Sequence, residues 1–263
     1  MKHFILLIFF FFFFASHAGK ERVFIDASKP LNEKEAILIL PGFGSRVQGT
    51  KHIADFFFNK GYDVYIPDYI ARKSISNCVN NLDKFITKYK LMDYKKVHVF
   101  SYIVGSWTLN NWFVKNPKNN IASIVYDRSP LQERAPYALV KDIPLIIRMV
   151  AGKIMKEFSK TPYPTLKTEN INTGIIIESK ATDLLKKHKK SALSLGPVSW
   201  DVVALNQPNN DFFYTWLSHD DMYTRFDVSG NEILYFFKNG KFTNESKHEP
   251  YTEDPFIPYT EKK

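Results

Sequence analysis

The chain has 263 residues, a formal net charge of +9 at pH 7, 44% hydrophobic residues and 24% charged residues. These values are typical of a globular protein and exclude a disordered or low-complexity chain, and the length favours a single domain with one sizeable core. Cys78 is the only cysteine, which excludes an internal disulfide. The positive charge indicates an ordinary basic surface or attraction to anionic membranes or acidic ligands. No nucleic-acid-binding motif accompanies it, so no nucleic-acid partner is expected.

The N-terminus has the pattern of a secretory signal peptide. Lys2 is followed by an apolar stretch, Phe4–Phe14, and then by the small residues around Ala15 and Ala18. A bilayer span needs roughly 20 apolar residues, and this stretch is shorter. We therefore expect residues 1–18 to be removed after Ala18 and the protein to be exported to a periplasm or secreted, the alternative being a retained membrane anchor.

Short apolar runs alternate with helical patterns in the first half of the chain. Ala36–Leu40 is a continuous apolar run, as expected for a strand that is covered on both faces. A glycine-rich turn follows at Pro41–Arg46, and Thr50 is expected to cap the next helix. The other expected elements are an edge strand at Arg22–Ile25, a helix from Thr50 to Asn59, a strand at Tyr62–Pro67, and a helix from Ser74 or Ser76 to about Tyr89.

The segment Val97–Ser106 reads as a buried strand, a sharp turn and a helix that runs to about Val114. Strand, tight turn and helix is the shape of a nucleophile elbow, G-x-S-x-G. When that motif is laid on this segment, Ser101 and Gly105 take the two outer small-residue positions. The middle position, which carries the nucleophile, is Ile103.

The second half resumes the alternation after an interruption. Residues 131–170 contain one long expected helix, Leu139–Phe158, and read as a lid-like insertion. A capping box at Ser229–Glu232 is expected to open a helix through Phe237, and residues 242–263 read as a Pro-rich, charged, loosely ordered tail. The remaining expected strands are Ile121–Tyr126, Gly174–Glu178 and Phe212–Leu217.

This alternation predicts an α/β fold with a mostly parallel sheet, helices on both faces and a helical insertion, in one domain over residues 19–241. The order of motifs resembles the α/β-hydrolase fold of esterases and lipases. Pro41–Gly44 is similar to the oxyanion loop of that fold and Ser101–Gly105 to its elbow, while residues 131–170 occupy the place of its lid. Glu178–Asp183 is similar to its acid loop, and Ser218-His219 to its histidine loop.

The resemblance implies roles for particular residues. His219 would be the base, and Asp183 the acid, with Asp127 as a substitute because it also follows a strand. The backbone N–H groups of Phe43 and Val104 would form the oxyanion hole. Ile103 has neither a lone pair nor a proton to supply, so the expected nucleophile is missing. Ser101 is the alternative nucleophile, if the turn is displaced by two residues. No cluster has metal-ligand spacing, and no cofactor motif is present, so neither is expected.

Two functional hypotheses follow. In the first, the chain is an exported α/β-hydrolase-fold protein that has lost catalysis and retains a pocket for a small apolar or acyl ligand under residues 131–170. In the second, it is an active esterase or lipase-like enzyme that uses Ser101 with His219 and either Asp183 or Asp127. A third, weaker hypothesis is contact with a membrane surface through a basic, amphipathic face of the insertion. The protein partner and the oligomeric state are not indicated.

Overall fold

The computed structural model describes residues 21–43, 47–161, 163–166 and 171–257. The expected signal peptide, residues 44–46 of the glycine-rich turn and residues 258–263 of the tail lie outside the described residues. None of the helices in the described part of the chain combines the length and the hydrophobicity needed to cross a bilayer.

One seven-stranded sheet forms the centre of the molecule, in the order β1-β3-β2-β4-β5-β6-β7. β1 pairs antiparallel with β3 at one edge, and every other neighbouring pair is parallel. The expected mostly parallel sheet is confirmed. The apolar runs become central strands because their side chains are buried on both faces. The strands are β1 Arg22–Phe24, β2 Glu35–Leu40, β3 Asp63–Ile66, β4 Lys96–Ser101, β5 Ile121–Arg128, β6 Asn172–Lys180 and β7 Asp211–Ser218.

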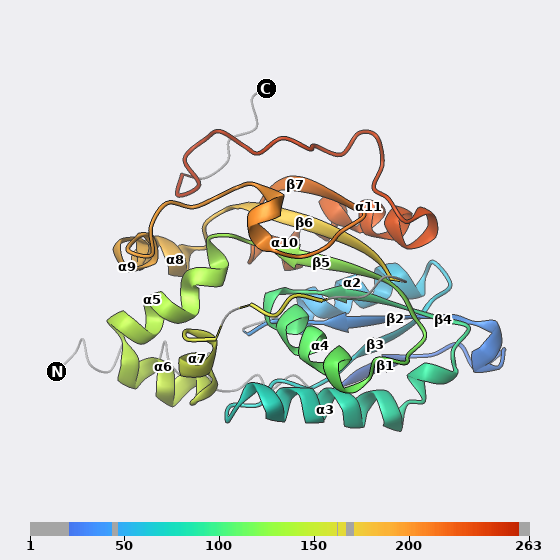
Figure 1. Ribbon diagram of the computed structural model, residues 1–263. Helices are drawn as coiled ribbons and strands as arrows, with labels where there is room; N and C mark the ends of the chain where they lie inside the picture. The colour runs from blue at the N-terminus through green and yellow to red at the C-terminus, as the bar shows by residue number, and fades with distance from the viewer. Residues whose placement is uncertain (1–20, 44–46, 162, 167–170, 258–263) are drawn as a thin grey trace.

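Helices cover both faces of the sheet, as expected. The helices α3 (Ile75–Lys88) and α4 (Ile103–Lys115) pack against each other on one face, and α2 (Val47–Phe58) and α11 (Phe226–Asn239) pack against each other on the other face (Figure 1). Each face has its own core cluster of buried apolar side chains. The sheet therefore presents the carboxyl ends of its parallel strands between two packed layers.

The insertion lies between β5 and β6 and gathers at the carboxyl ends of the strands (Figure 1). The single long helix expected over Leu139–Phe158 is wrong, because the chain forms α5 (Ala135–Asp142), α6 (Pro144–Ala151) and α7 (Ile154–Phe158). Pro144 ends the first helix, since the residue before a proline is driven out of helical geometry. Gly152 ends the second with a φ of 85°. A Cβ at Gly152 would lie 2.2 Å from the carbonyl oxygen of Arg72.

Of the three helix caps predicted from the sequence, one is confirmed and two are wrong. Ser74 caps α3 as expected, and its hydroxyl accepts a hydrogen bond from the backbone N–H of Asn77. Thr50 does not cap α2, which begins at Val47. The capping box at Ser229 is also wrong, because Ser229 is buried inside α11, and Glu232 instead accepts hydrogen bonds from Thr243 and Ser246. In both wrong predictions the local sequence pattern indicated a helix start, but contacts between distant residues determined where the helix begins.

The described part of the expected tail packs against the domain. Phe242 is buried against Phe213 and Phe236, and the backbone N–H of Tyr214 donates to the carbonyl of Lys247. The expectation of a loosely ordered tail is therefore wrong for this stretch. The remaining short helices are η1 Leu31–Glu33, η2 Leu91–Asp93, η3 Gln132–Arg134, α8 Asp183–Lys187, α9 Lys189–Leu193, η4 Val202–Leu205 and α10 Asp221–Thr224.

Candidate functional site

His219 lies directly after β7 and meets two carboxyl groups from neighbouring strands. Its Nδ1 atom lies 2.7 Å from Oε1 of Glu178, on β6, and 3.7 Å from Oδ2 of Asp127, on β5. Adjacent parallel strands place their carboxyl ends at one edge of the sheet, which brings these three residues together. Glu178 and Asp127 are completely buried, and His219 is 8% exposed.

Burial sets the protonation of this cluster. Desolvation raises the pKa of the Asp127 and Glu178 carboxyl groups well above their usual values, and the neighbouring Glu178 carboxylate raises that of Asp127 further. Desolvation also lowers the pKa of the His219 imidazole. We therefore expect His219 to be neutral and Asp127 to retain its proton at neutral pH. In the neutral imidazole, Nδ1–H of His219 can donate to Oε1 of Glu178 whichever protonation state that carboxyl group has.

Asp127, Glu178 and His219 are also the one group, among the residues described, whose ligand atoms lie close enough together to hold a metal ion. These atoms all lie within 4.8 Å of one another. Two ligands of a tetrahedral zinc, each about 2.05 Å from the metal, would be separated by about 3.3 Å. The 2.7 Å between Nδ1 of His219 and Oε1 of Glu178 is shorter and is a hydrogen-bond distance. The geometry fits an imidazole oriented by a carboxylate better than a ligand pair.

Two stacked tyrosine rings pack against the imidazole. The rings of Tyr102 and Tyr223 stack with their centroids 4.0 Å apart and an interplanar angle of 10°. Each meets the His219 ring edge to face, at 5.8 Å and 5.9 Å. The hydroxyl of Tyr223 accepts the backbone N–H of Gly42 at 2.8 Å, so one donor of the expected oxyanion loop is already occupied. Burial raises the pKa of both phenols well above the usual value, which keeps them protonated.

The turn between β4 and α4 is relaxed. Tyr102 is the residue between strand and helix, with ordinary extended dihedral angles of φ −74° and ψ 168°. The non-glycine residues with positive φ in the described chain are Lys90 and Asn206, neither of which is at this turn. Ile103 is the first residue of α4 and is 6% exposed. Gly105 fits its small-residue role, because a Cβ there would lie 2.4 Å from the carbonyl oxygen of Leu40.

Ser101 is buried and its hydroxyl is engaged away from His219. Its Oγ lies 2.6 Å from Oγ of Ser106 and donates to the carbonyl of Tyr102. Oγ of Ser106 also lies within hydrogen-bond distance of the carbonyl oxygens of Ser101 and Tyr102, so its single proton can be donated to one of these acceptors or to Ser101. Among the described residues, no serine hydroxyl forms a hydrogen bond with His219. The two serines bind the backbone at the start of α4.

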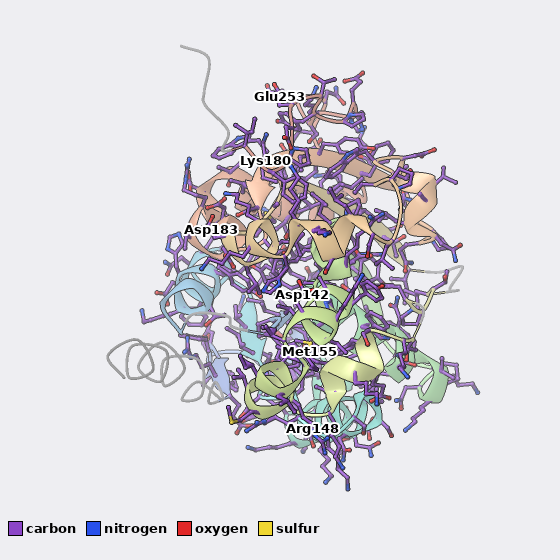
Figure 2. All side chains as sticks on the ribbon, turned by 90° about the vertical axis from the view of Figure 1, so that its left-hand side faces the viewer. Asp142, Arg148, Met155, Lys180, Asp183 and Glu253 are labelled. Atoms are coloured by element: carbon purple, nitrogen blue, oxygen red, sulfur yellow. The ribbon has the colours of Figure 1, made fainter. Side chains whose placement is uncertain are left out.

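The other candidate residues are dispersed. Asp183 begins α8, its side chain is 86% exposed, and its carboxylate pairs with Lys186 at 2.9 Å. Figure 2 places it near the left-hand edge of that view. The expected pairing of Asp183 with His219 is therefore not formed, whereas Asp127 does lie beside His219. Phe43 is half-buried and packs against Phe158, while Val104 lies in the first turn of α4, where backbone N–H groups have no acceptor within the helix.

Sequence reasoning missed Glu178, Tyr102 and Tyr223 as neighbours of His219. Glu178 carried a usable signal, because it is an acid directly after the apolar run Gly174–Ile177 of a buried strand. The strand continues past it to Lys180, with an irregularity in the pairing to β7 between the two residues. The tyrosines carried no comparable signal, since a Tyr looks the same in sequence whether it faces the core or a site.

A separate cavity of about 300 Å³ lies between the insertion and α4. Trp107 forms part of its wall and packs against Phe158 and Tyr163. The hydroxyl of Tyr163 donates to the carbonyl of Ile103, which connects the cavity to the turn before α4. The ring of Tyr163 also stacks on the buried guanidinium of Arg128 at 3.6 Å. The lining residues are Trp107, Pro130, Glu133, Arg134, Tyr137, Phe158, Ser159, Thr161, Tyr163 and Leu195.

Comparison with known proteins shows a likeness in structure only. No family model matches the sequence, and no curated protein matches it. Solved structures do match. A carboxylesterase of the archaeon Nitrososphaera gargenis is 9% identical, with a TM-score of 0.52 over 84% of this chain and 94% of that one. The chain has the α/β-hydrolase fold.

Other matches span different activities. A bromoperoxidase of Bacillus anthracis is 12% identical, with a TM-score of 0.51 over 83% of this chain and 95% of that one. The juvenile hormone epoxide hydrolase of the silkworm Bombyx mori is 8% identical, with a TM-score of 0.54 over 82% of this chain and 72% of that one. At these identities the α/β-hydrolase fold is shared and the chemistry is not transferred.

Proposed function

We propose that this chain is a ligand-binding protein with the α/β-hydrolase fold that does not catalyse hydrolysis. The observation that carries the proposal is the surroundings of His219, where two stacked tyrosine rings pack against the imidazole and no described serine hydroxyl reaches it. A base must lie within about 2.6–3.2 Å of the hydroxyl whose proton it removes, or reach it through one water. Without that hydroxyl, the acid and the imidazole have nothing to activate.

The cavity under the insertion supports the binding part of the proposal. A volume of about 300 Å³ is at the lower end of small-molecule sites. Its wall includes four aromatic side chains, and Glu133, which also lines it, is already neutralised by Arg128. The lining also includes Arg134, whose guanidinium donates to the backbone carbonyls of Ala192, Gly196 and Pro197. Such a lining suits a small aromatic or apolar molecule, including one with an acidic end. The proposed ligand is therefore a compact apolar compound, including a short acyl group.

One observation favours the second candidate function, an active esterase. The hydrogen bond between Glu178 and His219 is the arrangement that holds a catalytic imidazole in the correct tautomer. In that case Ser101 would have to leave Ser106 and turn toward His219. The same experiment distinguishes the two functions.

The experiment is labelling with a fluorophosphonate probe, together with hydrolysis of short-chain esters, using the purified chain. We expect no labelling and no hydrolysis by the wild type. Ile103→Ser tests the position given by the motif, and Tyr102→Ser tests the side chain that lies against His219. A gain of labelling in either variant that disappears on adding His219→Ala would support a lost nucleophile, with circular dichroism confirming that each variant folds.

Labelling of the wild type would overturn the proposal. If the labelled residue is a serine, and labelling is lost in both Ser101→Ala and His219→Ala, the chain is an esterase. Ser106→Ala is the matched control, since it removes the hydroxyl partner of Ser101 and leaves Ser101 itself in place.

A further inference from the structure

The helix α6 exposes apolar side chains on its outer face. Leu145 is 81% exposed and Met149 is 67% exposed, and residues four apart lie on the same face of a helix. On the same helix, Ile147 packs against the core clusters. The helix is therefore apolar on both sides, and packing within the domain accounts for only one of them.

Cations surround this exposed face. Arg148 lies on α6 itself, Lys153 directly precedes α7, and Lys156 lies within α7, and all three are exposed. The loop that carries Arg72 and Lys73 adjoins them, because the guanidinium of Arg72 donates to the carbonyl of Met149. Figure 2 shows Arg148 at the lower edge of the insertion, on the side that faces the viewer.

These cations are not neutralised from within the domain. Arg148, Lys153, Lys156 and Lys73 form no ion pair with any residue that the structure describes. The acidic groups nearby in the sequence are engaged elsewhere: Asp142 binds His188 and Ser191, and Glu157 accepts the backbone N–H of Ile75, at the start of α3. The surface thus combines exposed hydrocarbon with unpaired positive charge.

We propose that this surface, which we call the α6 face (Leu145, Met149, Arg148, Lys153, Lys156 and Lys73), docks onto an anionic membrane surface. Hydrocarbon side chains that enter the interface, flanked by cations that attract anionic headgroups, are the two contributions to interfacial binding. The net charge of +9 acts in the same direction at longer range. A second copy of the chain is a poorer occupant, because an isologous contact would bring two sets of like charges together.

Docking would set the orientation of the cavity. Phe158, which lines it, ends α7, and α7 packs against α6. A protein that binds the membrane through α6 would therefore hold this cavity close to the lipid, where apolar molecules concentrate. This surface role does not depend on whether the cavity binds a ligand.

The test is vesicle co-sedimentation of the full chain at low salt, with phosphatidylcholine vesicles that either contain or lack phosphatidylglycerol. We expect wild-type binding to vesicles with the anionic lipid to be about tenfold tighter than to vesicles without it. Leu145→Asp/Met149→Asp should weaken that binding by about tenfold or more. Arg148→Glu/Lys153→Glu should weaken it by a similar factor and reduce its dependence on salt.

Matched controls separate the α6 face from the rest of the surface. Val114 and Val203 are exposed to a similar degree, at 81% and 77%, on other elements. Val114→Asp/Val203→Asp and Lys118→Glu/Lys238→Glu should therefore bind several-fold more tightly than the matching α6 variants, because they lose only the long-range contribution of the net charge. If the α6 variants bind as tightly as these controls, or if binding ignores the anionic lipid, the proposal is wrong. Self-association that the α6 variants abolish, without vesicle binding, would also overturn it and assign the face to a second copy.

Discussion

The surroundings of His219 and the cavity beneath the insertion lie at the same end of the sheet, yet their contents differ. Around His219, two carboxyl groups and two tyrosine rings pack against the imidazole, and polar atoms are buried. Both oxygens of Asp127 have no hydrogen-bond partner among the described residues. In the cavity, aromatic side chains line about 300 Å³ of free volume. Among the described residues, the first region gathers ionisable groups around a buried imidazole, and the second is lined mainly by aromatic side chains together with Glu133 and Arg134.

This contrast has a physical cause. Burying an ionisable group lowers the free energy of unfolding unless the group is paired, whereas aromatic side chains in a cavity wall stabilise the fold because they also pack in the core. In the α/β-hydrolase fold the end of β5, the end of β6 and the loop after β7 converge whatever residues they carry. The backbone of the fold therefore brings Asp127, Glu178 and His219 together. Local packing determines which other side chains contact them.

The largest expected effect comes from breaking the cavity wall. Trp107→Ala should lower the free energy of unfolding by about 3–5 kcal/mol, because it removes a buried ring that packs on Phe158 and Tyr163. Val114→Ala, on the same helix and 81% exposed, should change it by less than about 0.5 kcal/mol. Urea denaturation followed by circular dichroism measures both. A loss below about 1 kcal/mol in Trp107→Ala would show that the insertion does not depend on this contact.

A smaller effect is expected at the acids beside His219. Because the pKa of Asp127 is raised in the folded chain, the folded state keeps a proton that the unfolded state releases above about pH 4. Stability conferred by that proton falls as the pH rises toward the folded pKa. Asp127→Asn removes this dependence, so the variant should gain about 1–3 kcal/mol relative to wild type between about pH 5 and about pH 8.

Denaturation at several pH values checks this expectation. A constant difference between Asp127→Asn and wild type across that range would mean that Asp127 titrates normally in the folded state. His219 acts in the opposite direction, because its lowered pKa costs stability as the pH falls below about 6.5. His219→Gln should therefore become relatively more stable toward acid pH, which separates the two contributions.

The smallest effect is expected at Asp183. Its carboxylate is exposed and its partner is a surface lysine, so Asp183→Asn should leave the melting temperature and its pH dependence unchanged. Glu178→Gln is the matched variant at the acid that does bind His219, and it should change both. Equal behaviour of the two variants would contradict the assignment of Glu178 as the partner.

The sheet was well predicted from the sequence, because central strands depend on local patterns. The turn before α4 was placed one residue late, since Tyr102 and not Ile103 lies between the strand and the helix. Ala36–Leu40 and Val97–Phe100 are unbroken apolar runs, and such runs become central strands of parallel sheets. The break of the insertion at Pro144 and Gly152 was also visible in the sequence, although the periodicity of the apolar residues suggested one helix.

The site was less accessible to sequence reasoning. His219 and Asp127 could be predicted because each lies at the end of a strand. The choice between Glu178 and Asp183 depends on where β6 ends. Because β6 continues two residues past Glu178, this acid looks like an ordinary strand residue in the sequence. Tyr223 contacts Gly42 only because α10 returns across the end of the sheet. The spacing of residues in the sequence does not indicate such a long-range contact.

The hydrogen bond between Gly42 and Tyr223 joins residues 181 positions apart in the chain. During synthesis the first part of the sheet can form early, but this corner cannot close until residue 223 has left the ribosome. Contacts of such long range slow folding, because the entropy of the intervening chain is lost before the contact is gained. A chain truncated before α10 would lack Tyr223 and would leave the imidazole's neighbours open to water.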